Sequence, residues 1–241
     1  MSWLLVLVGT LAGLIGAGSM AAKSARLEKA LAAASADAAR GHAAQAALFS
    51  EITRELRGLV LRLGLFSSGR ASLFHCRGDH FVLVGRFSPS PRYQRSSGRI
   101  THPINAGVIG VAWHKGSAER HLPSPGPNEQ EPSPRWLEAQ DRLGVPAEIA
   151  RALTMKSSAY AARRINDENG RPLGVLVIES DRDAIGHRQT SSVTQPRVSL
   201  ELLETAGDAE FAARMVRLLG TIAPLPNADV RRCVEDLLRQ W

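Results

Sequence analysis

Arginine residues gather around one segment of the chain, and their chemistry suggests an anion-binding site. Arg86, Arg92, Arg95 and Arg99 lie close to Tyr93 in the sequence. A guanidinium group presents several N–H donors in a planar fork that matches phosphate and carboxylate groups. We therefore expect an anionic small molecule, for example a nucleotide, to bind beneath the loop that these residues form. A charged, solvated rim is the other interpretation, and the sequence leaves it open.

A second group of residues is expected to complete this pocket. Arg163 begins an arginine pair on a later strand, and Trp113 and Tyr160 are aromatic residues on neighbouring elements, although aromatic side chains at such positions also serve as core. The candidate ligand-binding residues are Arg86, Tyr93, Arg95, Trp113, Tyr160 and Arg163.

Other patterns predict no catalytic chemistry. His75, Cys76 and His80 have a spacing that suggests a metal site, but neighbouring residues of a strand point to opposite faces, so we expect none. No glycine-rich phosphate loop and no G-x-S-x-G motif is present. Cys76 and Cys233 are expected to be reduced, buried thiols. The sequence predicts no catalytic residue, no metal and no cofactor.

The residues between these candidates predict an α+β domain. Alternating and apolar runs indicate two hairpins, and the run at 173–179 is apolar enough to occupy the centre of a sheet. Asn105 is expected to cap a helix. The predicted strands are 71–76, 80–87, 159–165 and 173–179; the helices are 105–113, 135–143, 146–155, 198–222 and 229–241; the polar loops are 88–99, 116–134 and 182–196.

The beginning of the chain predicts a membrane anchor. Residues 3–22 contain no charge and would form a helix of roughly 30 Å, about the thickness of the hydrocarbon layer. Lys23, Arg26 and Lys29 follow this segment and no basic residue precedes it, which places the rest of the chain in the cytoplasm. We expect a single-pass protein of the inner membrane. A cleaved signal peptide and an ordinary buried helix are the alternatives.

Residues 23–64 are rich in good helix formers and predict a helical connector. A weak heptad seam runs from Leu27 to Ile52, and a second seam, offset by one position, follows at Ile52, Leu56, Leu59 and Leu63. A parallel homodimer is our expectation. A single helix lying against its own domain is equally compatible with the pattern.

Two segments resemble motifs of the GAF domain family. NAGVIGVAWHKG at 105–116 is similar to that family's helix motif, and YAARRINDENGRPLGVLVIES at 160–180 is similar to its closing hairpin. The resemblance covers about residues 45–222 and implies an antiparallel sheet flanked by helices, with any ligand between the sheet and the loops. It also implies a sensor. Free methionine sulfoxide reductases share the fold, but they depend on several loop cysteines, which this chain lacks.

These observations predict four regions: an anchor at 1–22, a coiled-coil-like connector at 23–44, a GAF-like sensor domain at 45–222 and an amphipathic C-terminal helix at 223–241. We expect a non-catalytic module that binds a ligand or partner and signals through a separate protein. The alternatives are a membrane-bound adaptor of a stress or phage-defence complex, and a small redox or hydrolytic enzyme. The net charge of +7 is spread along the chain, so nucleic acid is not an expected partner.

Overall fold

The computed structural model describes residues 29, 39–41, 43–65, 69–94, 101–127, 131–181, 198–206 and 209–222. Its contacts divide the chain into two compact units, Met1–Ala46 and Ala47–Trp241, and the second contains the sheet. The predicted anchor at 3–22, most of the connector and the predicted helix at 229–241 lie outside the described residues. Among the helices that are described, none is long and apolar enough to cross a bilayer.

The domain is built on a six-stranded sheet in the order β3-β2-β1-β6-β5-β4, in which every pair of neighbours is antiparallel. The strands are β1 (Gly69–Arg77), β2 (His80–Phe87), β3 (Thr101–Pro103), β4 (Ser117–His121), β5 (Ala159–Asn166) and β6 (Pro172–Ser180). The most apolar run forms β6, which lies in the middle of the sheet between β1 and β5 and is buried from Gly174 to Ser180. The predicted central position of this strand is confirmed.

Both predicted hairpins are present. β1 and β2 are joined by a turn in which Gly78 has a φ of 59°, a value that L-residues rarely adopt. The β5–β6 turn is held by Asp167, whose carboxylate accepts hydrogen bonds from the backbone N–H groups of Asn169 and Arg171. Such side-chain-to-backbone bonds are the reason that Asp favours turns.

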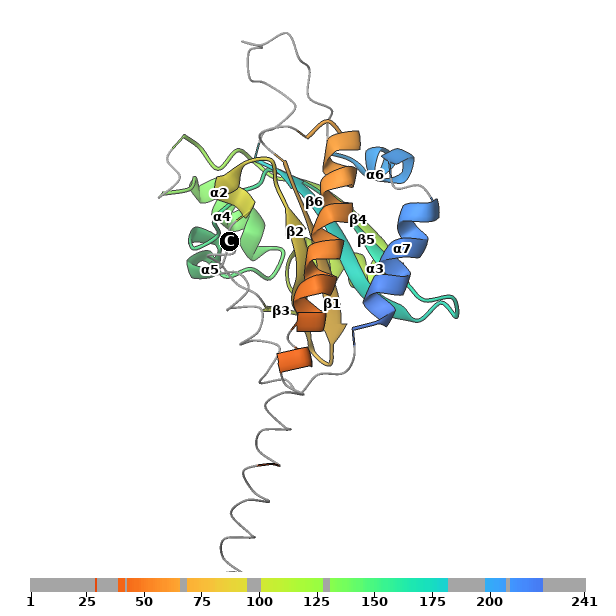
Figure 1. Ribbon diagram of the computed structural model, residues 1–241. Helices are drawn as coiled ribbons and strands as arrows, with labels where there is room; N and C mark the ends of the chain where they lie inside the picture. Colours follow the sequence, from red (N-terminus) through yellow and green to blue (C-terminus); the bar gives the residue numbers. More distant parts are fainter. Residues whose placement is uncertain are drawn as a thin grey trace, which may run out of the picture. The chain divides into compact units, whose positions relative to one another are not determined.

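Helices cover both faces of the sheet (Figure 1). On one face lie the helical residues 47–62, α6 (Leu200–Ala206) and α7 (Ala209–Gly220). The other face is covered by α3 (Gly107–Lys115), α4 (Pro134–Asp141) and α5 (Ala147–Arg151), and the short α2 (Pro91–Gln94) follows β2. The sheet therefore separates two apolar cores.

The first core buries the second predicted heptad seam. Ile52, Leu56 and Leu59 are fully buried with residues of β1, β6 and α7. Contact with the sheet is close, because a Cβ built on Gly85 would overlap Ile52. The seam at 52–63 therefore packs on the domain's own sheet, which is the alternative that the pattern left open.

Several elements differ from the sequence prediction. β3 and β4 were not expected, and β4 lies within the predicted loop at 116–134. Only Ala118 of β4 is buried, so this edge strand lacks the apolar alternation that reveals a strand. α2 lies within the other predicted loop, and the helix expected at 198–222 is described as α6 and α7.

The cap predicted for α3 is also wrong. The N-cap is Ala106, and it makes no side-chain capping bond. Asn105 Oδ1 instead lies 2.9 Å from His114 Nε2, so this side chain is engaged with the far end of the same helix.

Candidate ligand-binding pocket

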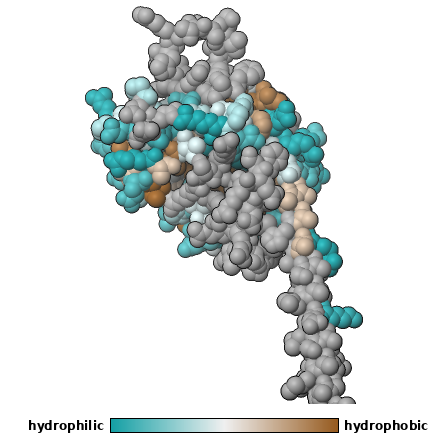
Figure 2. Space-filling model, turned by 60° about the vertical axis from the view of Figure 1, so that its left-hand side comes forward, coloured by the Kyte–Doolittle hydropathy of each residue, from teal (hydrophilic) through white to brown (hydrophobic). Residues whose placement is uncertain are grey.

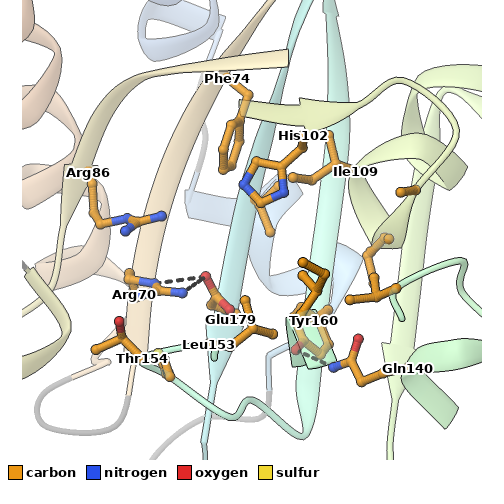
Figure 3. Close-up of a pocket in the computed structure, with 17 residues that line it drawn as sticks. Arg70, Phe74, Arg86, His102, Ile109, Gln140, Leu153, Thr154, Tyr160 and Glu179 are labelled. Atoms are coloured by element: carbon orange, nitrogen blue, oxygen red, sulfur yellow. Dashed lines mark hydrogen bonds and ion pairs between the residues drawn. The ribbon is translucent and has the colours of Figure 1, made fainter. Parts of the chain in front are cut away.

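A cavity of about 100 Å³ lies between the sheet and the helices α3, α4 and α5 (Figure 3). Its apolar wall includes Phe74 of β1, Ile109 of α3 and Val177 of β6, together with Leu153 and Met155 from the segment after α5. The described surface on this side is mostly hydrophilic, with small hydrophobic patches (Figure 2). The cavity is thus an apolar space inside a polar exterior, the usual character of a small-molecule site.

The polar end of the cavity is formed by a buried ion pair. Arg70 and Glu179 are directly opposite each other in the β1–β6 register, and their exposed fractions are 6% and 7%. Arg70 Nε and Nη2 each lie 2.8 Å from Glu179 Oε1, and the hydroxyl of Ser157 donates to Oε2 at 2.8 Å. Glu179 is therefore fully engaged, which is the condition under which a buried carboxylate is tolerated.

Arg86 is the second buried cation of the cavity, and it is 8% exposed. Its Nε donates to the Ser72 hydroxyl at 3.1 Å, and the rest of its guanidinium points toward the cavity (Figure 3). Burial, and then the charge of Arg70, lower the pKa of Arg86 to about 9, while Glu179 acts in the opposite direction. The group is still cationic at pH 7.

A β-bulge sets the direction of Arg86. The register of β1 with β2 shifts between Leu73 and Phe74, where the partners change from Gly85 to Leu83. Phe81 and Leu83 face the cavity side of the sheet, and strict alternation would turn Arg86 toward the opposite face. The extra residue reverses the alternation and brings Arg86 to the cavity.

Tyr160 and Gln140 complete the polar part of the lining. Gln140 Nε2 donates to the Tyr160 hydroxyl at 3.1 Å, and both residues are buried. Burial, reinforced by the negative charge of Glu179, raises the pKa of Tyr160. The phenol therefore remains neutral and polar at physiological pH.

The six candidate residues are distributed over different places. Arg86 and Tyr160 line the cavity together. Tyr93, on α2, donates to Asp181 Oδ2 at 2.5 Å and lines a neighbouring cavity of about 130 Å³. Trp113 makes an edge-to-face contact with Phe81 in the core, with the ring centres 5.4 Å apart.

Arg163 is mostly exposed and pairs with Glu204 at 3.6 Å, outside the cavity. Arg95 lies outside the described residues. Sequence reasoning did not select Arg70, Glu179, Gln140 or Ser157, because each is an isolated polar residue whose partner is defined only by strand register and helix packing.

The histidine and the cysteine of β1 do not line the cavity. His75 Nδ1 lies 2.9 Å from the Leu173 carbonyl oxygen. Cys76 is partly exposed, and burial raises the pKa of its thiol, so the thiolate is disfavoured at pH 7. Within the described ranges, no group of three His, Cys, Asp or Glu side chains is arranged to hold a metal ion. Cys233 lies outside those ranges.

Comparisons with known proteins concern the fold. No protein-family model and no curated protein sequence matches the chain. Solved structures that resemble it are mostly GAF domains. The antiparallel sheet flanked by helices that the sequence resemblance predicted is present in this chain. The GAF domain of a two-component sensor histidine kinase from Bacillus halodurans is 14% identical, with a TM-score of 0.39, over 70% of this chain and 93% of that chain.

Two enzymes are among the similar structures. The type II free methionine-R-sulfoxide reductase from Thermoplasma acidophilum is 11% identical, with a TM-score of 0.44, over 73% of this chain and 94% of that chain. The free methionine-R-sulfoxide reductase from Neisseria meningitidis, in complex with its substrate, is 16% identical, with a TM-score of 0.37, over 80% of each chain. The likeness concerns the arrangement of strands and helices, and the side chains of the cavity carry the functional argument.

Proposed function

We propose that this chain is a membrane-anchored sensory module that binds a small molecule in the cavity between the sheet and α3–α5 and passes the signal to a separate protein. The observation that carries the proposal is the cavity itself, which combines apolar walls with a buried polar cluster. A domain that needed only stability would have little use for two arginines and a glutamate in its core, because buried ion pairs are seldom better than apolar packing. We propose no catalytic step.

The position of the cavity suggests how occupancy is transmitted. Phe74 lines the cavity, and its neighbour Leu73 packs on the opposite face, in the core that contains Ile52 and Leu56 of the helical residues 47–62. A ligand that shifts β1 therefore acts on the packing of that helix. The ligand can shift the equilibrium between two packing arrangements of this helix on the sheet. The size of the shift is limited by the difference between the ligand's affinities for the two arrangements.

The membrane part of the proposal is supported by the uncharged run at 3–22 and the basic residues that follow it. We propose one inner-membrane span with the domain in the cytoplasm. The seam that begins at Leu27 supports a homodimer.

Native mass spectrometry of the full-length chain, released from detergent micelles, tests the binding proposal. The expected result is an adduct with the mass of a small molecule, either as purified or after incubation with the small-molecule fraction of the host cells. Leu153→Trp fills the cavity and should abolish the adduct. Leu61→Trp is the matched control, because Leu61 is 51% exposed and does not line the cavity. A chain that carries no adduct under either condition contradicts the proposal.

Substitution of the two cysteines distinguishes a binding module from a redox enzyme. Cys76→Ser and Cys233→Ser should leave adduct formation unchanged, because Cys76 does not line the cavity and its thiolate is disfavoured. Turnover of a sulfoxide that is lost in either variant would instead support redox chemistry.

A further inference from the structure

We propose that the ligand of this cavity is a small monocarboxylate with a short apolar body, and that Arg86 binds its carboxylate. This inference rests on the proposed function and specifies its ligand. The central observation is a cationic side chain more than nine-tenths buried and directed into a cavity (Figure 3). A guanidinium in that setting is largely removed from bulk solvent, so an anion that accepts its N–H groups stabilises it strongly.

The hydrogen bonds of Arg86 leave its fork available. Among the described residues, the only side-chain bond of Arg86 is the one from Nε to Ser72, and no carboxylate forms an ion pair with it. Arg70 differs, because it holds Glu179 through two nitrogens and also donates to the Tyr93 carbonyl at 3.5 Å. Arg70 is thus engaged inside the protein, whereas the Nη groups of Arg86 face the space where a ligand would lie.

The charges in the cavity favour a monoanion. Arg70 and Glu179 neutralise each other, so Arg86 leaves one positive charge, and one carboxylate would neutralise it. Glu179 lies near enough to raise the pKa of Arg86 and would repel the second charge of a phosphate dianion. Besides these residues, the lining contains two titratable rings, Tyr160 and His102, and His102 stands edge-on to Phe74.

The size and the walls of the cavity define the remainder of the ligand. A volume of about 100 Å³ is of the same order as the roughly 150 Å³ of an engineered cavity that accommodates benzene, so a ligand of about that size is expected. Phe74, Ile109 and Leu153 offer only hydrocarbon contacts. A branched acyl chain of about four carbons matches this space, whereas a nucleotide, which the sequence suggested, is too large for it.

Isothermal titration calorimetry of the full-length chain in detergent tests the inference, with isobutyrate and isovalerate as probes. The neutral amides of the same acids, isobutyramide and isovaleramide, keep the shape and remove the charge. Inorganic phosphate tests the alternative oxyanion. We expect both carboxylates to bind, and we expect the amides and phosphate to bind at least tenfold more weakly.

Arg86→Gln should weaken carboxylate binding by about 10- to 150-fold, the range that corresponds to one hydrogen bond to a charged group. Arg163→Gln is the matched control, because it removes the same charge from an exposed position outside the cavity, and it should change the affinity less than twofold. Arg86→Lys keeps the charge but loses the planar fork of N–H donors. Its affinity for the carboxylates should therefore lie between that of the wild type and that of Arg86→Gln. Circular dichroism of each variant establishes that it is folded.

Three results would overturn the inference: equal binding by the wild type and Arg86→Gln, amides that bind as tightly as the acids, or phosphate that binds more tightly than either carboxylate. Absence of carboxylate binding by a chain that retains another small molecule would refute the ligand class and leave the proposed function standing. Absence of both would refute the two proposals together.

Discussion

The ion pair between Arg70 and Glu179 provides the most demanding test of the structure. We consider the variants Arg70→Met and Glu179→Leu and the variant that combines them. Each single substitution leaves a charge in a site that is at least nine-tenths buried, while the combined variant replaces both charges with apolar side chains of similar length.

The expected magnitudes follow from the contacts. Glu179→Leu removes the acceptor of two Arg70 nitrogens and leaves Arg70 beside Arg86 with no carboxylate between them. Removal of one partner of a buried pair typically costs about 3–5 kcal/mol. Arg70→Met should lie near the lower end of that range, because Glu179 keeps the Ser157 hydroxyl as a donor and has Arg86 nearby. The combined variant should lose no more than about 1 kcal/mol.

Urea unfolding of the full-length chain, followed by tryptophan fluorescence, measures these free energies. We expect each single variant to lower the midpoint with an unchanged slope. In thermal unfolding the same losses correspond to a fall in Tm of roughly 6–20 °C for a domain of this size class. The double-mutant cycle should give a coupling free energy of at least about 5 kcal/mol, because the two single losses together exceed the combined loss by that amount.

The reasoning would be refuted by single variants that lose less than about 1 kcal/mol. It would also be refuted by a combined variant whose loss is the sum of the two single losses, because additivity means that the residues do not interact. Arg163→Gln serves as the control for removal of a charge, since the pair of Arg163 with Glu204 is solvated and should contribute less than about 1 kcal/mol.

Substitutions of Gly174 and of His75, each with a control variant, test other parts of the domain. Gly174→Ala should destabilise the domain by more than about 2 kcal/mol in urea unfolding, because the added Cβ would overlap the Phe74 carbonyl oxygen. Gly58→Ala is the control; it lies in a helix with room for a methyl group and should stabilise the domain by about 0.5–1 kcal/mol. The opposite order of stabilities would contradict the packing described. Burial lowers the pKa of His75 below its ordinary 6.5, so the unfolded chain binds more protons, and the stability that depends on this histidine is lost as the pH falls below 6.5. The fall in Tm between pH 7.5 and 5 should therefore be smaller in His75→Gln than in the wild type or in the exposed-site control His114→Gln, and equal slopes would contradict this assignment.

The sequence predicts the strands whose side chains alternate or are uniformly apolar. β1, β2, β5 and β6 were expected because burial imposes a regular pattern on their residues. β3 and β4 have no such pattern, because they are short strands at the two edges of the sheet. Each is held by backbone hydrogen bonds to its one neighbouring strand. Edge strands of this kind are defined by tertiary pairing and not by their own residues.

The site could be predicted only in part for a related reason. Arg86 and Tyr160 were selected by residue type. The direction of the Arg86 side chain depends on a one-residue bulge, and no sequence motif predicts that bulge. The pairing of Arg70 with Glu179 follows from the β1–β6 register across a sequence separation of 109 residues. Residue chemistry therefore suggested an anionic ligand, and the strand register determines that Arg86 lines the cavity.

An experimental structure of the full-length chain prepared with saturating isovalerate tests the central claim most directly. The account predicts density for the carboxylate within hydrogen-bond distance of the Arg86 Nη groups, with the alkyl group against Phe74 and Ile109 and with the Arg70–Glu179 pair intact. An empty cavity at saturation, or isovalerate bound elsewhere on the chain, would contradict it.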